Sequence, residues 1–294
     1  MREALARGRD YLKRCSVENP FLDAEVLLAR VTGLDRAGLY REGERKLAQK
    51  EAAAYSQLLA RRAAREPVAY LTGEKEFMGL SFLVNPAVLI PRPETELLVE
   101  NALLLAREFF SSGEPVFLAE AGTGSGAVAV SVASFLPDSF VYATDISPGA
   151  LAVAEKNAER QGVREKIVFL EGDLLSPLFA LGLTGRINIV LANLPYVPTA
   201  RLKRLAPDVR RYEPLLALDG GPDGLSLYRR LIPQARHLLS VPGWLLVEIG
   251  PGQGAGILQF LEDDARNAPG GRPWEAEVLF DYGGRERIVR AKIG

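Results

Sequence analysis

Short apolar segments alternate with helical patterns along most of the chain after Glu94. The strand-like segments are VFLAE, FVYATD, KIVFLEGD, INIVLAN and GWLLVEIG. Parallel strands need long crossover connections, which are usually helices. The alternation therefore predicts an α/β fold with a mostly parallel, doubly wound sheet that helices cover on both faces. The last segment, EAEVLFDYGGRERIVRAKI, predicts a hairpin that turns at Gly283-Gly284 and adds an antiparallel edge.

The amino-terminal part of the chain has a different pattern. The segment FLDAEVLLARVTGL repeats apolar residues at helical spacing, which predicts a shared face for Leu22, Val26, Leu27 and Leu28. A later segment, AQKEAAAYSQLLARRAAREP, is rich in strong helix formers. Short helices are stable mainly through packing of their apolar faces. Residues 1–72 are therefore predicted to form a small helical bundle.

A hairpin linker is predicted over residues 73–91. There Gly79, Asn85 and Pro86 interrupt a run of Phe, Val, Leu and Ile, which is typical of short strands joined by turns. The remaining residues, 92–294, are predicted to form the sheet domain.

The composition excludes several kinds of active site. The chain has 294 residues, a formal net charge of -1, one Cys and one His. A single Cys cannot form a disulfide within the chain, and Cys/His zinc sites need more ligands than these, so no metal is expected. The lone His237 lies in a helical stretch without a partner motif, and we predict a structural role for it.

Charge and hydropathy also limit the partners. The near-neutral balance lacks the basic excess that is typical of proteins that coat nucleic acid. The first residues lack the apolar core of a signal peptide, and no apolar run approaches the length of a membrane span. We therefore expect a cytoplasmic protein with no direct nucleic-acid or membrane partner.

A glycine-rich turn, EAGTGSGAVAV, joins the first strand of the predicted sheet to a helix. Gly122, Gly124 and Gly126 have the spacing G-x-G-x-G. Glycines at this junction let the backbone approach a ligand that binds outside the carboxyl ends of the strands. Ala127 replaces the third glycine of the dinucleotide fingerprint, which weakens a pyrophosphate-binding interpretation without excluding it.

Acidic residues lie at successive strand ends of the same unit. Asp145 ends the second strand, Asp173 ends the third, and Glu120 directly precedes the glycine turn. Carboxylates on one rim suit a ligand that is cationic or rich in hydroxyls and amines, and they would repel a pyrophosphate. We predict S-adenosylmethionine, with Asp145 on the ribose hydroxyls, Asp173 near the adenine amino group and Leu174 against the ring. Capping of the next helix remains the alternative role for Asp145.

The fourth strand ends in Asn193-Leu194-Pro195-Tyr196. An amide or aromatic amine nitrogen is difficult to methylate because its lone pair is delocalised. The Asn193 side-chain oxygen and the Leu194 backbone carbonyl can accept both N–H protons of such a group and direct its lone pair toward a methyl donor. Pro195 restricts Leu194 to extended geometry, and Tyr196 offers an aromatic face to the planar group. The motif predicts methyl transfer that depends on alignment rather than on a general base; a simple proline turn is the alternative.

These segments resemble the protein glutamine-N5 methyltransferases of the PrmC/HemK family, which modify the Gly-Gly-Gln loop of peptide chain release factors. The resemblance covers essentially the whole chain. It is carried by DAEVLL, the connector EPVAYLTGEKEFMGLSFLVNPAVLIPRPETELLVE, the turn EAGTGSGA and the later segment RYEPLLALDGGPDGL. It implies a Rossmann-like class I methyltransferase sheet behind an amino-terminal helical domain, with S-adenosylmethionine as cofactor and release factors as partners.

The resemblance also implies roles for individual residues. The implied cofactor site consists of Gly122, Thr123, Gly124, Ser125, Gly126, Asp145, Asp173, Leu174, Asn193, Phe77 and Glu120. The implied glutamine site consists of Asn193, Leu194, Pro195, Tyr196, Arg92 and Glu94. Two positions depart from the family pattern: Leu194 replaces the first Pro of N-P-P-Y, and Glu120 replaces the Asp that opens the glycine motif. The implied acceptor at Leu194 is a backbone carbonyl, so the chemistry is retained.

Alternative substrates follow from the same motif. Asn-Leu-Pro-Tyr also resembles the motif of ribosomal RNA adenine dimethylases, but the connector argues against an RNA or DNA substrate. A sister enzyme that methylates a glutamine of a ribosomal protein is a closer alternative, and PRPETE favours the release factor. A nucleotide-binding oxidoreductase is the alternative from another class. We expect the bundle to recognise the body of the release factor, and the chain to act as a monomer.

Overall fold

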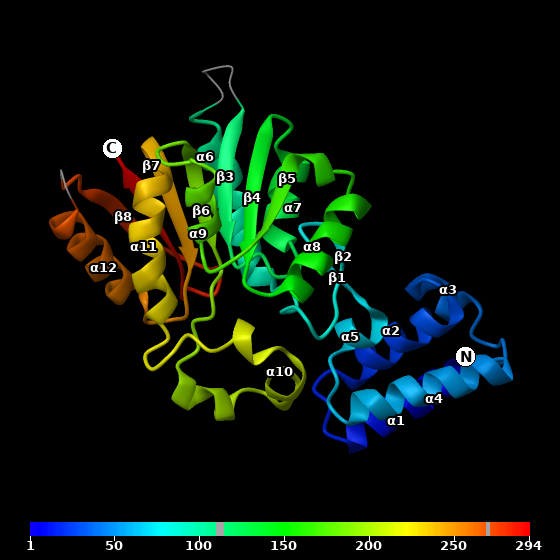
Figure 1. Ribbon diagram of the computed structural model, residues 1–294. Coiled ribbons are helices and arrows are strands. Elements are labelled where there is room, and N and C mark those ends of the chain that lie inside the picture. The colour runs from blue at the N-terminus through cyan, green and yellow to red at the C-terminus, as the bar shows by residue number, and fades with distance from the viewer. Residues whose placement is uncertain (110–114, 269–270) are drawn as a thin grey trace. The chain divides into compact units, whose positions relative to one another are not determined.

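The computed structural model describes residues 1–109, 115–268 and 271–294 (Figure 1). Among these residues, no helix combines the length and the apolar character that a membrane crossing needs. The chain forms two compact units. They consist of Met1–Glu74 with Leu205–Glu213, and of Lys75–Arg204 with Pro214–Gly294.

The first unit is helical. Its helices are α1 (Arg2–Arg14), α2 (Pro20–Thr32), α3 (Arg36–Arg41), α4 (Gln49–Ala63), α5 (Val68–Thr72) and α10 (Pro207–Tyr212). Leu27 and Leu28 are fully buried in its core, as the pattern predicted, but Leu22 is 49% exposed. The prediction for Leu22 was wrong because Asp23 and Ala24 occupy the inward positions one turn before Leu27 and Leu28.

The second unit contains a short hairpin and a seven-stranded sheet. The hairpin is β1 (Glu74–Phe77) with β2 (Leu80–Leu83), and its first residue, Glu74, belongs to the first unit. The strands of the large sheet are β3 (Val116–Ala121), β4 (Ser139–Asp145), β5 (Ile167–Glu171), β6 (Ile187–Ala192), β7 (Leu239–Glu248), β8 (Trp274–Phe280) and β9 (Glu286–Ile293). Its α-helices are α6 (Glu96–Ala106), α7 (Ala127–Phe135), α8 (Pro148–Arg160), α9 (Ser176–Ala180), α11 (Ser226–Leu238) and α12 (Gly254–Asn267). Short 3₁₀ turns are η1 (Pro93–Thr95), η3 (Arg164–Lys166), η4 (Thr199–Arg204) and η5 (Leu215–Ala217).

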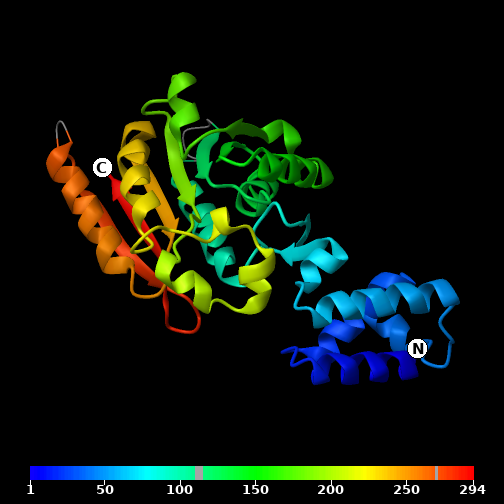
Figure 2. The same cartoon turned by 60° about the horizontal axis from the view of Figure 1, so that its bottom comes forward.

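The sheet has the order β5-β4-β3-β6-β7-β9-β8. Strands β3 to β7 pair in parallel, whereas β9 pairs antiparallel with β7 and β8. The α/β fold class and the antiparallel carboxyl-terminal hairpin are therefore confirmed. Helices α11 and α12 lie in front of the sheet in Figure 1, with α6 and α7 behind it, and Figure 2 shows the same layers after a rotation.

Adjacent residues of one strand serve opposite faces of the sheet. Leu118 and Leu191 are buried in the cluster with α6 and α7. Ala119 and Val190 are buried in the cluster with α11 and α12. This alternation is the period of two that a pleated strand imposes, and burial on both faces explains why the strand segments are almost wholly apolar.

The strand order positions the candidate site. Strand β3 lies between β4 and β6, and the chain order reverses at this point of the sheet. The carboxyl ends of these three strands are Ala121, Asp145 and Ala192. The residues that follow them, including the glycine turn and Asn193, therefore share one edge at a topological switch point, where sheets of this class bind ligands.

Candidate active site

A cavity of about 370 Å³ lies at this edge of the second unit. Its volume falls in the range of roughly 300–1,000 Å³ that is usual for small-molecule sites. Most of the predicted site residues line it: Arg92, Glu120, Gly122, Thr123, Gly124, Ser125, Asp145, Asp173, Leu174, Asn193, Leu194 and Pro195. The structure thus brings together residues from the connector, the glycine turn, the strand ends and the Asn-Leu-Pro-Tyr motif.

The glycine turn needs glycine for two different reasons. Gly122, Gly124 and Gly126 have φ angles of +74°, +55° and +79°, a conformation that other residues rarely adopt. A Cβ at Gly126 would lie 3.1 Å from the Cα of Ala154 in α8, so the turn packs closely against that helix. A Cβ at Gly124 would meet nothing within 4 Å. Gly124 therefore borders open space in the cavity.

Asp145 connects the ends of β3 and β4. Its carboxylate accepts hydrogen bonds from the backbone N–H groups of Gly124 at 2.8 Å and Ser147 at 2.9 Å. The Ser147 side chain caps α8 by accepting from the Ala150 N–H at 3.2 Å, so Asp145 is not the N-cap residue. Burial raises the pKa of Asp145, and the backbone donors oppose that shift. The Asp145 carboxylate is partly buried, borders the cavity and is held in place by two backbone N–H groups. A carboxylate in this position suits a ligand that carries hydroxyl or cationic groups.

Glu120 is buried behind the glycine turn. Its carboxylate accepts from the Thr123 hydroxyl at 2.6 Å and from the Ala129 N–H at 3.1 Å. Burial raises the pKa of Glu120 to about 7, and these two hydrogen bonds oppose the shift. The side chain therefore holds the turn against the first residues of α7.

Asp173 has a partner that the sequence pattern did not reveal. Arg230 of α11 forms an ion pair with its carboxylate and also lines the cavity. Both side chains are about half exposed, and exposed pairs stabilise a protein by only about 0–1 kcal/mol. A ligand amine can therefore compete with Arg230 for this carboxylate. Leu174 beside it has a positive φ of 52°, and the Thr144 hydroxyl holds its carbonyl at 2.6 Å.

Asn193 is held by a residue of the connector. Its side-chain Nδ2 donates to the Thr95 Oγ1 at 3.1 Å. Burial raises the pKa of the Glu248 carboxyl group, at the end of β7, to about 7, and the nearby Thr95 hydroxyl opposes that shift. Sequence reasoning missed both residues, although Thr95 lies in PRPETE and Glu248 is an acid at the end of the apolar strand segment GWLLVEIG.

The other residues of the motif are also anchored. The buried Tyr228 hydroxyl donates to the Glu248 carbonyl, and its oxygen lies 3.2 Å from the Leu194 carbonyl oxygen. The Tyr196 carbonyl accepts from Gln253 Nε2 at 3.0 Å. The Tyr196 hydroxyl lies 3.4 Å from Glu248 Oε1. Strands and helices that follow the motif in the chain therefore support its backbone.

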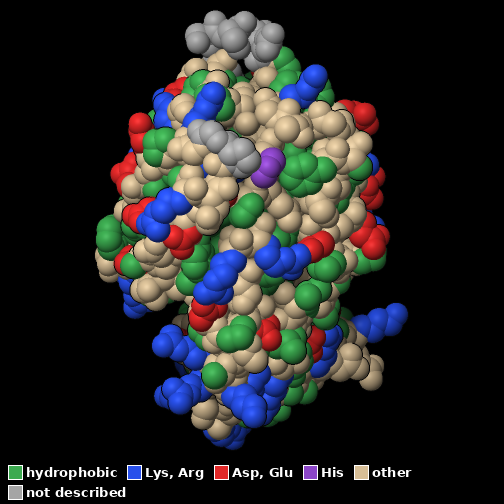
Figure 3. Space-filling model, turned by 60° about the vertical axis from the view of Figure 1, so that its left-hand side comes forward, with side chains coloured by type: hydrophobic (Ala, Val, Ile, Leu, Met, Phe, Trp, Pro, Cys, Tyr) green, Lys and Arg blue, Asp and Glu red, His purple; other side chains and the backbone are tan. Residues whose placement is uncertain are grey.

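Some predicted residues lie outside the cavity lining: Phe77, Glu94, Gly126 and Tyr196. Phe77 is 1% exposed and packs edge-on against Phe82 in the hydrophobic core. His237 is exposed, and its Nδ1 contacts the Pro233 carbonyl at 2.7 Å (Figure 3, His in purple). No cluster of His, Cys, Asp or Glu that could hold a metal ion occurs within the described part of the chain.

Comparisons with known proteins define the class. Residues 3–73 match the PrmC N-terminal domain, and residues 118–212 match a methyltransferase domain. The solved structure of the hMettl16 catalytic domain, in complex with an RNA hairpin of a 3′UTR, has a TM-score of 0.55 at 16% identity, covering 78% of this chain and 80% of that chain. This likeness concerns the fold alone. The second unit therefore has the fold of a class I methyltransferase.

Relatives over the full length define the family. The release factor glutamine methyltransferase of Moorella thermoacetica is 47% identical, covering 99% of this chain and 98% of its own length. That of Geobacter sulfurreducens is 45% identical, covering 100% of this chain and 97% of its own length. The chain belongs to the family of release factor glutamine methyltransferases, as the resemblance to PrmC/HemK enzymes predicted.

Proposed function

We propose that this protein transfers the methyl group of S-adenosylmethionine to the side-chain amide nitrogen, N5, of the glutamine in the Gly-Gly-Gln loop of bacterial release factors. The observation that supports this most directly is the position of Asn193, which lines one cavity with Gly122, Gly124 and Asp145. An amide-binding motif and a site suited to the cofactor thus share one space. The names of the full-length relatives support the release factor as substrate. Such a substrate places the reaction in the cytoplasm.

Residues of the glycine turn and the strand ends would hold the cofactor. The open backbone at Gly124 admits close approach, and the carboxylates of Asp145 and Asp173 suit ribose hydroxyls and the adenine amine. The unhindered turn and the acidic rim fit a cationic nucleoside better than a pyrophosphate. When bound, the cofactor supplies an electrophilic methyl group on a sulfonium sulfur.

The Asn193 Oδ1 and the Leu194 carbonyl would bind the substrate amide. If each accepts one N–H proton of the glutamine, its nitrogen lone pair is directed away from both acceptors and toward the methyl group. The lone pair forms the new N–CH₃ bond, the S–CH₃ bond breaks with its electrons left on sulfur, and the nitrogen loses one proton to water. Alignment and fixed dipoles, rather than a strong base, provide the rate enhancement.

A methyl-transfer assay tests cofactor, reaction and substrate together. Labelled S-adenosylmethionine is incubated with a bacterial release factor and with a variant in which Ala replaces the loop glutamine. We expect label in the first and none in the second. Equal labelling of both would contradict the glutamine assignment, and preferential labelling of a ribosomal protein or of RNA would favour the alternative substrates.

Asn193→Ala tests the amide-binding role. Loss of one positioned acceptor should lower kcat by about 10²–10³-fold. The affinity for S-adenosylhomocysteine, measured by calorimetry, should change little because the glycine turn and Asp145 are untouched. An unchanged kcat would contradict the proposed role of Asn193.

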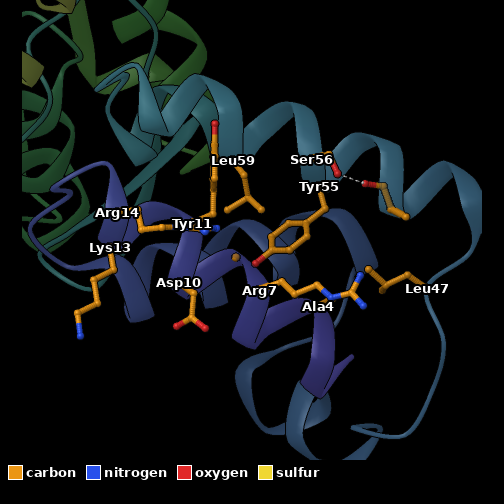
Figure 4. Close-up of a pocket in the computed structure, with 12 residues that line it drawn as sticks. Ala4, Arg7, Asp10, Tyr11, Lys13, Arg14, Leu47, Tyr55, Ser56 and Leu59 are labelled. Carbon is orange, nitrogen blue, oxygen red and sulfur yellow. Dashed lines mark hydrogen bonds between the residues drawn. The ribbon is translucent and has the colours of Figure 1, made fainter.

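We further propose that the amino-terminal bundle binds the body of the release factor through a groove between α1 and α4. The groove has a volume of about 1010 Å³. Tyr11, Tyr55 and Leu59 lie along it (Figure 4). Gly8 of α1 lets Tyr55 approach, since a Cβ there would lie 2.2 Å from the Tyr55 hydroxyl oxygen. Tyr55 is 3% exposed and forms the floor of the groove, whereas Tyr11 is 38% exposed and offers the kind of aromatic side chain that is enriched at protein interfaces.

Charge indicates the kind of surface that this groove accepts. Residues 1–74 contain 14 Lys and Arg against 11 Asp and Glu, a net charge of +3 in a chain whose total is -1. Arg7, Lys13 and Arg14 line the groove together with one acidic residue, Asp10, and all four are exposed. An acidic, partly apolar patch on the release factor would complement it.

Charge reversal in the full-length protein tests this docking role. The double variant Lys13→Glu/Arg14→Glu should raise KM for the intact release factor about tenfold and leave KM for a short Gly-Gly-Gln peptide unchanged. Arg30→Glu/Arg41→Glu, which reverses two exposed charges of the bundle away from the groove, is the matched control. Equal effects of the two double variants would contradict the groove as the docking site.

A further inference from the structure

The corner of the chain that follows β5, residues 172–175, holds Leu174 in an unusual backbone conformation. Leu174 has a φ of +52°, in the left-handed region that leucine rarely adopts. Its side chain is buried and lines the cavity beside Asp173, where the sequence predicts the adenine ring. A strained conformation of this kind persists only where its surroundings hold it in place.

Two side chains hold the peptide group that joins Leu174 to Leu175. The Thr144 hydroxyl, near the end of β4, donates to the Leu174 carbonyl at 2.6 Å. The Leu175 N–H donates to Gln234 Oε1 of α11 at 2.9 Å. A peptide group is planar, so bonds at its oxygen and at its N–H together fix its orientation, and with it the ψ angle of Leu174.

Thr144 also holds the glycine turn. Its backbone carbonyl accepts from the N–H groups of Gly122 and Thr123, at 2.9 Å each. Its hydroxyl oxygen lies 3.1 Å from the Glu120 carbonyl, but a hydroxyl has a single proton, and the bond to Leu174 is the shorter one. Thr144 is fully buried and does not line the cavity, so it can act on a ligand only through these neighbours.

Helix α11 contacts the same corner through two residues that lie one turn apart. Arg230 pairs with the Asp173 carboxylate, and Gln234 accepts from the Leu175 N–H. Residues at this spacing share one face of a helix. The ion pair is half exposed and leaves the carboxylate open to a ligand amine, whereas the bond from Gln234 fixes the backbone of the corner.

We propose that Thr144 and Gln234 are positioning residues that clamp the peptide group between Leu174 and Leu175, and thereby hold Leu174 as a fixed wall of the site for the adenine ring. The inference rests on the proposed function, because it takes the bound nucleoside to be that of S-adenosylmethionine. Without the clamp, Leu174 relaxes to a negative φ, and its side chain leaves this position. The ligand then loses contacts at its base and keeps those at the glycine turn.

Calorimetry with S-adenosylhomocysteine tests the clamp. Thr144→Val keeps the shape of the side chain but removes the hydroxyl, and it should weaken binding about tenfold, the equivalent of one hydrogen bond. Thr144→Ser keeps the hydroxyl and should bind within about twofold of the wild type. Gln234→Met removes the acceptor for the Leu175 N–H and should also weaken binding about tenfold.

Two results would overturn the proposal at this point. Equal loss of affinity in Thr144→Val and Thr144→Ser would show that the hydroxyl is not what matters. Wild-type affinity in Thr144→Val or in Gln234→Met would show that the residue concerned does not position Leu174.

Ser139 offers a matched control for the loss of a buried hydroxyl. It begins the same strand, β4, and donates to the Leu136 carbonyl at 2.8 Å, at the end of the strand that lies away from the cavity. Ser139→Ala should lower the melting temperature but leave the affinity for S-adenosylhomocysteine unchanged. If it weakens binding as much as Thr144→Val does, the lost affinity reflects general destabilisation of β4, and the proposal fails.

A double-mutant cycle shows whether Thr144 acts through Leu174. Glycine adopts a positive φ freely and has no side chain, so Leu174→Gly needs no clamp and provides no wall. Thr144→Val should therefore weaken binding about tenfold in the wild type but less than about twofold in the Leu174→Gly background. Equal loss in both backgrounds would place the effect of Thr144 elsewhere and overturn the proposal.

A crystal structure without ligand keeps this inference separate from the proposed function. In Thr144→Val/Gln234→Met, or in Thr144→Val alone if the double variant does not fold, Leu174 should have a negative φ. A φ that stays near +52° would overturn the clamp even if the wild type binds S-adenosylhomocysteine and methylates release factor. A rearranged Leu174, in a protein whose wild type does not bind S-adenosylhomocysteine, would support the clamp and contradict the proposed function.

Discussion

Leu194 contributes its backbone carbonyl to the proposed glutamine site and its side chain to the hydrophobic core. The side chain is 3% exposed and packs with buried residues of α11 and β7. Its Cδ2 lies 3.0 Å from where a Cβ of Gly122 would be, so the leucine also supports the glycine turn from below. The side chain of Leu194 is therefore a packing residue, and the function that we propose for Leu194 needs only its backbone carbonyl.

Leu194→Pro tests this separation. The carbonyl remains, so kcat should stay within about threefold of the wild type, a change of less than ~0.7 kcal/mol in the activation barrier. The lost buried volume should lower the free energy of unfolding by about 1–3 kcal/mol. Steady-state kinetics and urea denaturation measure the two effects. A large loss of kcat in a folded variant would contradict the carbonyl role.

The glycine turn joins β3 to α7. One of its glycines packs against a neighbouring helix, and another borders the cavity that we propose binds the cofactor. Gly126 faces the backbone of α8, whereas Gly124 faces open space in the cavity. The G-x-G-x-G spacing alone could not separate these roles, because they depend on where α8 and the cavity lie.

Two alanine substitutions in this turn should differ in effect: one should mainly lower the stability of the protein, and the other should mainly weaken the binding of S-adenosylhomocysteine. Gly126→Ala should destabilise the protein by about 2–4 kcal/mol, because overpacking adds to the strain of its positive φ. Gly124→Ala has the φ strain alone, about 1 kcal/mol, but its methyl group enters the cavity and should weaken S-adenosylhomocysteine binding about tenfold. Thermal unfolding and calorimetry distinguish them. The same loss of melting temperature in both variants would contradict the assignment.

At the scale of the whole molecule, one segment of the chain leaves the catalytic unit and returns to it. Leu205–Glu213 belongs to the helical unit, although the residues on either side of it belong to the sheet unit. Asp208 in this segment accepts from Arg62 at 2.7 Å and from Arg65 at 2.6 Å, and Arg62 also pairs with the buried Asp23 at 2.6 Å. This ion-pair network anchors a segment that begins nine residues after Tyr196.

Asp208→Asn should loosen that segment. Burial raises the pKa of Asp208, but the hydrogen bonds and charges of Arg62 and Arg65 outweigh it and lower the pKa overall. The stabilisation is therefore present above the ordinary carboxyl pKa of about 4 and is lost as pH falls below it. At neutral pH the variant should lose about 1–3 kcal/mol of unfolding free energy and be cleaved faster in limited proteolysis near residues 205–213.

The exposed pair of Asp223 and Arg229 offers the matched control. Its side chains are 44% and 46% exposed. Asp223→Asn should change stability by at most about 0.5 kcal/mol, because exposed ion pairs contribute little. If Asp208→Asn lowers the unfolding free energy no more than Asp223→Asn does, and is cleaved no faster in limited proteolysis, the ion-pair network does not anchor the segment.

Local patterns along the chain predicted the fold class, the edge of the sheet that we propose binds the cofactor, and the residues of the Asn-Leu-Pro-Tyr motif. Apolar strands buried on both faces, a turn that requires positive φ, and acids at strand ends are local requirements, so they are visible as patterns along the chain. The helical periodicity wrongly placed Leu22 on the buried face of α2. The buried face of a helix depends on which other elements pack against it, and periodicity alone does not contain that information.

The residues that support the candidate site can be identified only from the way distant elements pack. Arg230 reaches Asp173 from 57 residues away, and Thr95 meets Asn193 across 98 residues. The pairing of β6 with β7 brings Glu248 to the same edge of the sheet as Asn193. The ion pair of Asp208 with Arg62 attaches the segment Leu205–Glu213 to the helical bundle. Contacts of this kind depend on where distant elements pack, and no periodicity or spacing encodes them.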